Sequence, residues 1–280
     1  MEAMLKEGID ITGLALPRSF RFLSGLKTNI AFMTPAWAEL VKLDFTSRLA
    51  AIRNDATREK LIEETRGNAD IEPRANNFFY LSDGESPEYT KGPDQCLTAI
   101  AKAAGEIPAE TWIRYMLESD GEALFHVRFG NHDYAAMEAF LKNDWILPSL
   151  GDTGALLTQI IDAGWATFML AHWHREKGLF TLAETIKKLT GAQARILGFD
   201  DRGVLAEGKR ADVNIIDMDK VIECQPQLIR DFSNDPPRLT QKAEGYKATI
   251  CNGAVIVENG ELTGQRAGRV LRNQVKASAA

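Results

Sequence analysis

A short apolar run that ends in a glycine-flanked aspartate is the feature that most constrains this sequence. Residues 145–150 read Trp-Ile-Leu-Pro-Ser-Leu and lead directly into Gly151-Asp152-Thr153-Gly154, after which a helical pattern begins. A lone carboxylate on a tight loop after a buried strand is typical of the catalytic face of an α/β barrel, which makes Asp152 a candidate catalytic residue. The same side chain can instead cap the next helix, and the local sequence leaves both interpretations open.

A second group of patterns lies downstream. Thr181-Leu-Ala-Glu184 has the spacing of a capping box and begins a helix with apolar residues on one face. That helix runs into Thr-Gly-Ala-Gln-Ala-Arg-Ile-Leu-Gly at residues 190–198. Residues 202–217 then read as a tight polar turn that feeds a short apolar strand.

The order of these elements resembles the C-terminal end of the metal-dependent amidohydrolase superfamily. There the last barrel strand ends in an Asp, a helix ends in a T-x-x-x-A-x-x-L-G phrase, and a G-x-L-x-x-G-x-x-A-D strand returns to a small β-domain. This chain carries the two phrases at residues 190–198 and 203–212. Residues 251–264 and 268–272 are similar to the end of the N-acyl-D-amino-acid deacylases (D-aminoacylases). The resemblance covers most of the chain.

The resemblance implies an α/β fold, namely the C-terminal part of a TIM-like (β/α)8 barrel with a helical insertion, plus a small antiparallel β subdomain. We expect the barrel part at residues 1–199, with the insertion at about 20–140, and the β subdomain at residues 200–280. A complete barrel takes about 250 residues. Because only 151 residues precede Asp152, we expect the chain to need the N-terminal part of its own barrel.

Local patterns predict the elements in more detail. Asn252-Gly253 between two β-branched runs predicts a hairpin in the subdomain. Apolar periodicity predicts helices at 35–40, 46–66, 97–105, 108–118 and 134–141, and strands at 9–16 and 123–127. Loops are predicted at 17–22 and at 68–93, the second of which contains one short strand at 78–81.

The resemblance also implies the chemistry. Amidohydrolases use one or two divalent ions, here expected to be zinc, to lower the pKa of a bound water from about 15.7 toward 7. A carboxylate accepts the water proton and delivers it to the leaving amine. By resemblance Asp152 takes this role and is also a metal ligand. The implied reaction is hydrolysis of a non-peptide carbon–nitrogen bond, foremost the deacylation of a small N-acyl-D-amino acid. A cyclic-amide hydrolase or deaminase, and a catalytically silent binding or structural module, remain alternatives.

The histidines do not supply the metal site that the family uses, a His-x-His on the first barrel strand and two further His on middle strands. His172 and His174 have a suggestive spacing, but residues 162–178 read as a helix, on which i and i+2 point roughly 200° apart. We expect both at a helix end that faces a loop or solvent, and His126 as a satisfied core residue. Most metal ligands are therefore expected outside this chain, which by itself should bind metal weakly and be inactive.

Two residues are candidate substrate contacts. Arg18 follows the predicted strand at 9–16, and a guanidinium suits a substrate carboxylate, although a solvated surface Arg is the alternative. Asn131-His132-Asp133 resembles an N-x-D/E phrase of the deacylases, which implies that His132 lies near the substrate. The family usually has a His where this chain has Leu156. This departure favours the silent-module alternative.

Composition limits the remaining classes of function. The chain has 280 residues, of which 45% are hydrophobic and 26% charged, and a net charge of −6 that argues against a nucleic-acid partner. No apolar stretch approaches the roughly 20 residues of a membrane span, and no signal peptide is recognisable, so we expect no membrane partner. Three widely spaced cysteines fit a reducing compartment, for which we expect the cytoplasm.

Overall fold

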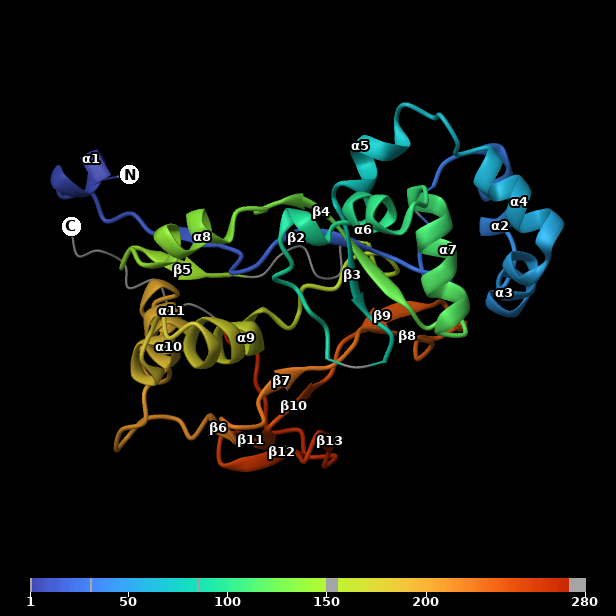
Figure 1. Cartoon of the computed structure of the whole chain (residues 1–280). Helices are drawn as coiled ribbons and strands as arrows, with labels where there is room; N and C mark the ends of the chain where they lie inside the picture. The colour runs from blue at the N-terminus through green and yellow to red at the C-terminus, as the bar shows by residue number, and fades with distance from the viewer. Residues whose placement is uncertain (1, 31, 85, 150–155, 272–280) are drawn as a thin grey trace.

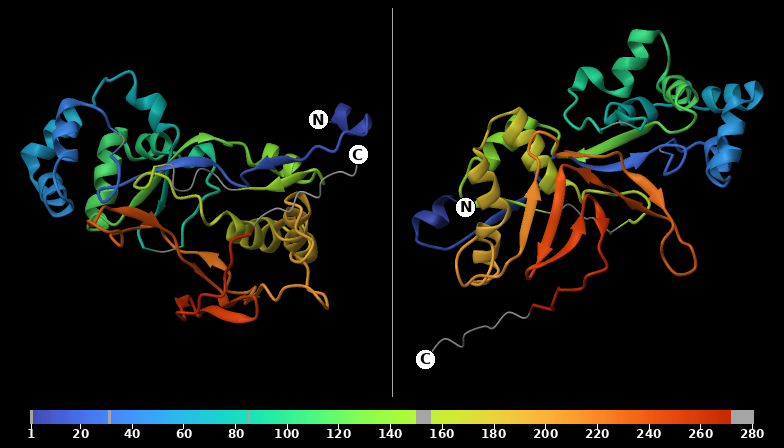
Figure 2. Two further views of the ribbon diagram at one scale, coloured as in Figure 1. Left: turned by 180° about the vertical axis from the view of Figure 1, so that it is seen from behind. Right: turned by 90° about the horizontal axis from the view of Figure 1, so that it is seen from below.

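The computed structural model describes residues 2–30, 32–84, 86–149 and 156–271 (Figure 1). It combines helices with several small sheets, which confirms the predicted mixture of α and β structure. The helices of residues 35–63 lie at one end of the molecule and α1 (Glu2–Lys6) lies at the other (Figures 1 and 2). No helix within these ranges is long and apolar enough to span a bilayer.

Two strands that are far apart in the sequence form a parallel pair. Strand β1 (Gly13–Ala15) runs beside β5 (Ile146–Pro148), with Ala15 opposite Pro148. The Ser149 amide extends the pairing by donating to the Ala15 carbonyl at 2.9 Å. Both strands lie within predicted strands and are shorter than predicted. Because the pair is parallel, the residues that follow the two strands meet at one edge, called here the carboxyl edge.

An antiparallel sheet occupies the chain between β1 and β5. In the described residues it has three strands, in the order β2 (Phe20–Ser24), β4 (Leu124–Gly130) and β3 (Phe78–Ser82). Strands β3 and β4 were predicted at 78–81 and 123–127, whereas β2 was not, and the sheet that the three form corrects the description of the insertion as helical. Strand β2 was missed because Arg21 interrupts its apolar run, yet the side chain of Arg21 is only 1% exposed.

Helices pack around this sheet and complete the inserted region. They are α2 (Pro35–Val41), α3 (Phe45–Arg53), α4 (Asp55–Glu63), α5 (Ile71–Ala75), α6 (Leu97–Ala104) and α7 (Pro108–Glu118). All but α5 were predicted; α5 lies where a loop was expected. Gly105 ends α6 in the left-handed region at φ 71°, a conformation that favours glycine. Trp37 and Trp112 meet edge to face at 5.5 Å between ring centroids in the core of this region.

Helix α8 leads from the inserted sheet back to the parallel pair, and further helices follow residue 164. They are α8 (Tyr134–Leu141), α9 (Trp165–Phe168), which continues into the π-helical segment η2 (Met169–Glu176), α10 (Leu182–Leu189) and α11 (Gly191–Ile196). The predicted capping box is confirmed: the Thr181 amide donates to the Glu184 carboxylate at 2.8 Å, and the Glu184 amide donates to Thr181 Oγ1 at 3.2 Å.

The C-terminal region consists of short antiparallel strands along one side of the molecule (Figure 2). They are β6 (Val213–Ile216), β7 (Ile222–Glu223), β8 (Gln227–Ile229), β9 (Arg238–Thr240), β10 (Ala243–Glu244), β11 (Tyr246–Cys251), β12 (Ala254–Glu258) and β13 (Glu261–Leu262). The predicted hairpin joins β11 to β12, and Asn252 and Gly253 have the positive φ values, 48° and 83°, that its tight turn requires. The proposed boundaries at residues 199 and 200 stay predictions.

Candidate functional site

Residues from two other parts of the chain contact the carboxyl edge of the β1–β5 pair. Asn131 Nδ2 donates to the carbonyls of Leu16 and Arg18, each at 3.4 Å. Trp173 Nε1 of η2 donates to the Pro17 carbonyl at 2.7 Å. The segment that leaves β1 is therefore fixed by the residues ahead of α8 and by the π-helical segment.

Asp152, the predicted catalytic residue, falls within residues 150–155, which lie outside the described residues. Its roles as acid–base group and metal ligand stay predictions. The described neighbours on either side are Ser149, bonded to Ala15, and Leu156, which is 44% exposed.

Arg18 is fully buried, so the alternative of a solvated surface residue is wrong. Its guanidinium forms an ion pair with Glu223 of β7, and its Nη2 lies 3.5 Å from Asp162 Oδ1. Burial by itself lowers the pKa of Arg18, but the attraction of Glu223, Tyr89 and Asp162 outweighs it, and the pKa is raised. The predicted role of Arg18 as a substrate clamp stays a prediction, and its charge is already matched by carboxylates of the protein.

Arg21 completes this buried cluster. Its Nη2 lies 2.9 Å from Asp162 Oδ1. The guanidinium carbons of Arg18 and Arg21 lie 4.3 and 4.0 Å from the ring centroid of Tyr89, whose hydroxyl accepts a hydrogen bond from Gln241 at 2.7 Å. Sequence reasoning missed Arg21, Asp162 and Glu223. The available signal was a single charged residue inside an apolar run, as in Ile160-Ile161-Asp162.

His126 lies in the core, as predicted, but the described residues do not provide its expected hydrogen bonds. It is fully buried on the central strand β4, and neither ring nitrogen has a hydrogen-bond partner among the described residues. Burial, followed by the repulsion of Arg128, Arg21 and other cations, holds the pKa of His126 well below its usual value. The side chain is therefore neutral near pH 7.

His172 and His174 lie on the predicted helix and have separate partners. His172 Nδ1 is 3.0 Å from Glu176, and its ring stacks on Phe168 at 4.7 Å. His174 Nδ1 is 2.9 Å from the carbonyl of Phe180. The expectation that both face a loop or solvent is wrong for His172, which is only 5% exposed. This burial lowers the pKa of His172.

The described residues do not fit a metal centre. Within the described ranges, no group of three or more His, Cys, Asp or Glu side chains is arranged to hold an ion. The histidines explain this result, because His126 is enclosed in the inserted sheet while His172 and His174 bond to different groups. A bound metal ion would need ligands beyond the described residues.

A cleft of about 430 Å³ lies beside the carboxyl edge, between β1 and α8. Its walls include Leu14, Leu16, Met137 and Phe140, and exposed His132 lines it. The next residue, Asp133, caps α8 by accepting from the amides of Ala135 and Ala136. The role of His132 in substrate binding stays a prediction.

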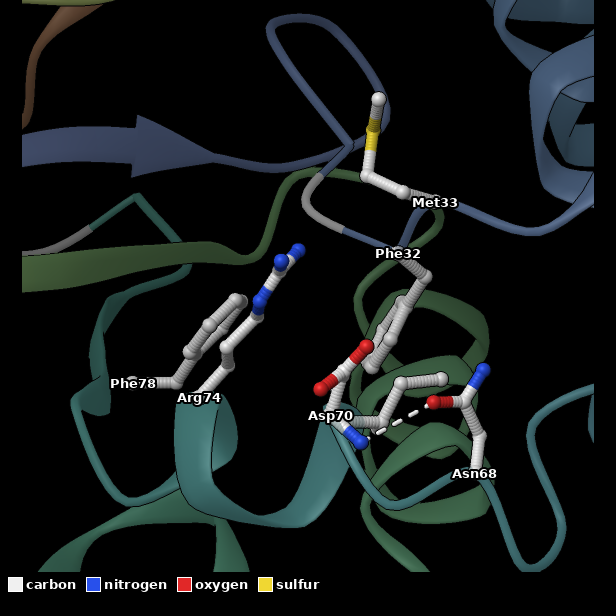
Figure 3. A pocket seen from close by; sticks show the side chains of 7 residues that line it. Phe32, Met33, Asn68, Asp70, Arg74 and Phe78 are labelled. Carbon is white, nitrogen blue, oxygen red and sulfur yellow. Dashed lines mark hydrogen bonds between the residues drawn. The ribbon is translucent and has the colours of Figure 1, made fainter.

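A smaller hollow of about 110 Å³ lies in the inserted region (Figure 3). Phe32 and Phe78 line it, and the side chains of Asp70 and Arg74 extend into its opening (Figure 3). It contains none of the predicted site residues.

The chain belongs to the amidohydrolase family. The family model described as "Amidohydrolase family" matches residues 31–257. The D-aminoacylase of Alcaligenes xylosoxydans xylosoxydans is 36% identical over 110 residues, which are 38% of this chain and 21% of that protein. The N-acyl-D-glutamate deacylase of the same organism is 31% identical over 118 residues, 41% of this chain and 22% of that protein. The resemblance predicted from the sequence is confirmed.

A third curated relative is the dihydroorotase of Endomicrobium trichonymphae, 32% identical over 82 residues, 29% of this chain and 19% of that protein. The matched regions thus span about a fifth of the length of the curated relatives. A crystal structure of a D-aminoacylase aligns with a TM-score of 0.40 and 23% identity, over 70% of this chain and 38% of that chain.

Proposed function

We propose that this chain is part of a metal-dependent amidohydrolase that releases a D-amino acid from its N-acyl derivative. The observation that carries the proposal is the match of the chain to the amidohydrolase family over residues 31–257, together with its similarity to a D-aminoacylase and an N-acyl-D-glutamate deacylase. The reaction breaks one amide bond and consumes one water, giving a carboxylic acid and a free amino acid.

In this proposal β1 and β5 are neighbouring strands of a TIM-like barrel, and Asp152 follows β5 in the sequence. The Asp152 carboxylate takes a proton from the attacking water and passes it to the departing amine nitrogen, a role that contributes typically 10²–10⁴-fold to such reactions. Arg18 and His132 are the proposed substrate contacts. The parallel pairing of β1 with β5 supports this arrangement, because active sites of α/β barrels form at the carboxyl ends of the strands.

Zinc is the proposed ion, with Asp152 as one ligand and the remaining ligands outside this chain. The enzyme would then work as this chain together with the N-terminal part of its own barrel, and that combination is called here the complete enzyme. The lack of a three-ligand cluster in the described residues supports this division.

The hydrolysis of a cyclic amide is a second candidate function. The similarity to a dihydroorotase over 82 residues favours it. The products distinguish the two reactions, because ring opening yields one molecule whereas deacylation yields two.

The test is a substrate panel on the zinc-loaded complete enzyme, with N-acetyl-D-methionine, N-acetyl-D-glutamate, their L-enantiomers and dihydroorotate. We expect free D-amino acid from the D-substrates, and a loss of about 10²–10⁴-fold in kcat for Asp152→Asn. Ring opening of dihydroorotate alone would replace the first candidate by the second. Unchanged activity of Asp152→Asn would remove Asp152 from the mechanism, and no turnover of any substrate would favour a silent module.

A further inference from the structure

Four charged side chains from separate segments meet in the interior, next to the carboxyl edge. Arg18 follows β1, Arg21 is on β2, Asp162 precedes α9 and Glu223 is on β7. None is more than 4% exposed. Two cations and two anions thus neutralise one another where water does not reach them, which makes each contact sensitive to geometry.

Asp162 is the member that joins the two arginines. Its Oδ1 lies 2.9 Å from Arg21 Nη2 and 3.5 Å from Arg18 Nη2. Arg18 is the residue whose carbonyl accepts from Asn131. A displacement of Asp162 therefore shifts the segment that leaves β1 and strand β2 together.

The backbone ahead of Asp162 is fixed from two sides. The Leu157 carbonyl accepts a hydrogen bond from the Leu239 amide at 2.7 Å, and the Gln159 carbonyl accepts from the Leu23 amide at 2.8 Å. Leu239 belongs to β9, and Leu23 belongs to β2. At the C-terminal end of this segment Asp162 adds its contacts with Arg18 and Arg21. Residues 157–162 are therefore bonded both to the inserted sheet and to the C-terminal strands.

We propose that Asp162 is a positioning residue for the reaction: through Arg18 and Arg21 it sets the placement of the carboxyl edge and of residues 156–162. The inference rests on the proposed function, in which the proton-transferring group lies in the same stretch of chain. Asp162 is fully buried, and in this proposal it acts through its arginine partners and not through a contact with the substrate. A misplacement of reacting groups by about 1 Å can lower a rate about 10²-fold, so a small shift of this edge is visible in kcat.

The experiment uses the zinc-loaded complete enzyme, with kcat and KM measured at a temperature at which circular dichroism shows every variant fully folded. Asp162→Asn keeps the size of the side chain and removes its charge. We expect kcat to fall about 10–100-fold with KM changed by less than about threefold. Asp162→Glu keeps the charge and is expected to restore part of kcat.

Leu61→Ala is the matched control, because it destabilises the buried core of the helical region without touching the cluster. It should retain kcat.

A second variant covers the case in which Asp162→Asn does not fold. Arg21→Lys keeps the charge but shortens the reach toward Asp162, and the same loss of kcat is expected. If Asp162→Asn and Arg21→Lys, once folded, both turn over like Leu61→Ala, the positioning role is wrong and the cluster is structural. The substrate panel on the parent enzyme separates this result from a failure of the proposed function. No turnover of any substrate by the parent enzyme overturns the function itself, whereas turnover by the parent enzyme together with unchanged kcat in the Asp162 variants overturns the positioning role alone.

Discussion

The guanidinium of Arg18 forms a buried ion pair with the carboxylate of Glu223, 205 residues further along the chain. One partner follows strand β1 of the parallel pair, and the other belongs to β7 of the C-terminal strands. The pair therefore connects the C-terminal region to the carboxyl edge directly. Because both side chains are buried, neither charge has water as an alternative partner.

Glu223→Gln is expected to destabilise the chain by about 3–5 kcal/mol, because it leaves the Arg18 cation buried with a weaker partner. Urea unfolding measures the change. Asp231→Asn is the matched control, since it breaks the exposed pair with Arg238, and it should lower the free energy of unfolding by about 1 kcal/mol or less. An equal decrease in the free energy of unfolding for the two variants would contradict a larger stabilising contribution of the buried pair.

Gly164→Ala is expected to disturb the same pair by contact alone. A Cβ at Gly164 would lie 1.6 Å from Glu223 Oε1, so the Glu223 carboxylate or the backbone must move. Overpacking of this kind costs about 1–3 kcal/mol. Gly268→Ala, where a Cβ meets no atom within 4 Å, is the control.

The double variant Gly164→Ala with Glu223→Ala tests the mechanism of that loss. Shortening residue 223 removes the atoms that the new Cβ would meet, so the two changes should cost less together than the sum of their separate costs. Strict additivity in urea unfolding would show that the Gly164 substitution acts through other neighbours.

Acidification is expected to lower the free energy of unfolding because His126 is buried in its neutral form. Its pKa is depressed well below the usual value in the folded chain, so the unfolded chain binds more protons as the pH falls below about 6.5. The free energy of unfolding is therefore highest above about pH 6.5 as far as His126 is concerned, and it decreases as the pH falls below this value. His126→Leu should flatten the pH dependence of the free energy of unfolding between about pH 6.5 and 5. An identical pH slope for His126→Leu and the parent would contradict this assignment.

The 280-residue chain alone is expected to bind zinc weakly and to show no deacylase turnover, because its described residues contain no cluster of three metal-binding side chains. Equilibrium dialysis with metal analysis, and an assay for free D-amino acid, measure both properties. Stoichiometric tight zinc together with turnover would overturn the division of ligands proposed above.

Local signals predicted local structure well. The capping box at Thr181 and the hairpin at Asn252-Gly253 depend on groups only a few residues apart, so the sequence displays the whole interaction. The resemblance to amidohydrolases also depended on short phrases in consecutive order.

Long-range pairing escaped prediction for a physical reason. Nothing near Arg18 in the sequence indicates that Glu223 neutralises it, so a charged loop residue was expected where a buried one is found. Strand β2 was missed for the same reason, since Arg21 reads as polar until Asp162 is placed beside it. The sequence therefore offers a candidate where a motif is contiguous, as at Asp152, whose role stays a prediction. It does not reveal an environment that distant segments create, as around Arg18.

The pairing of Phe20 with Gly130 brings the two ends of the inserted region together on adjacent strands. Ser24 at the end of β2 likewise pairs with Phe125 near the start of β4, so residues 25–123 leave the sheet and return to it at neighbouring positions. A replacement of residues 25–123 by a segment of another length would leave the end of β2 next to the start of β4, and Arg21 in place. Homologues with a different number of helices here should therefore retain the surroundings of the buried charges.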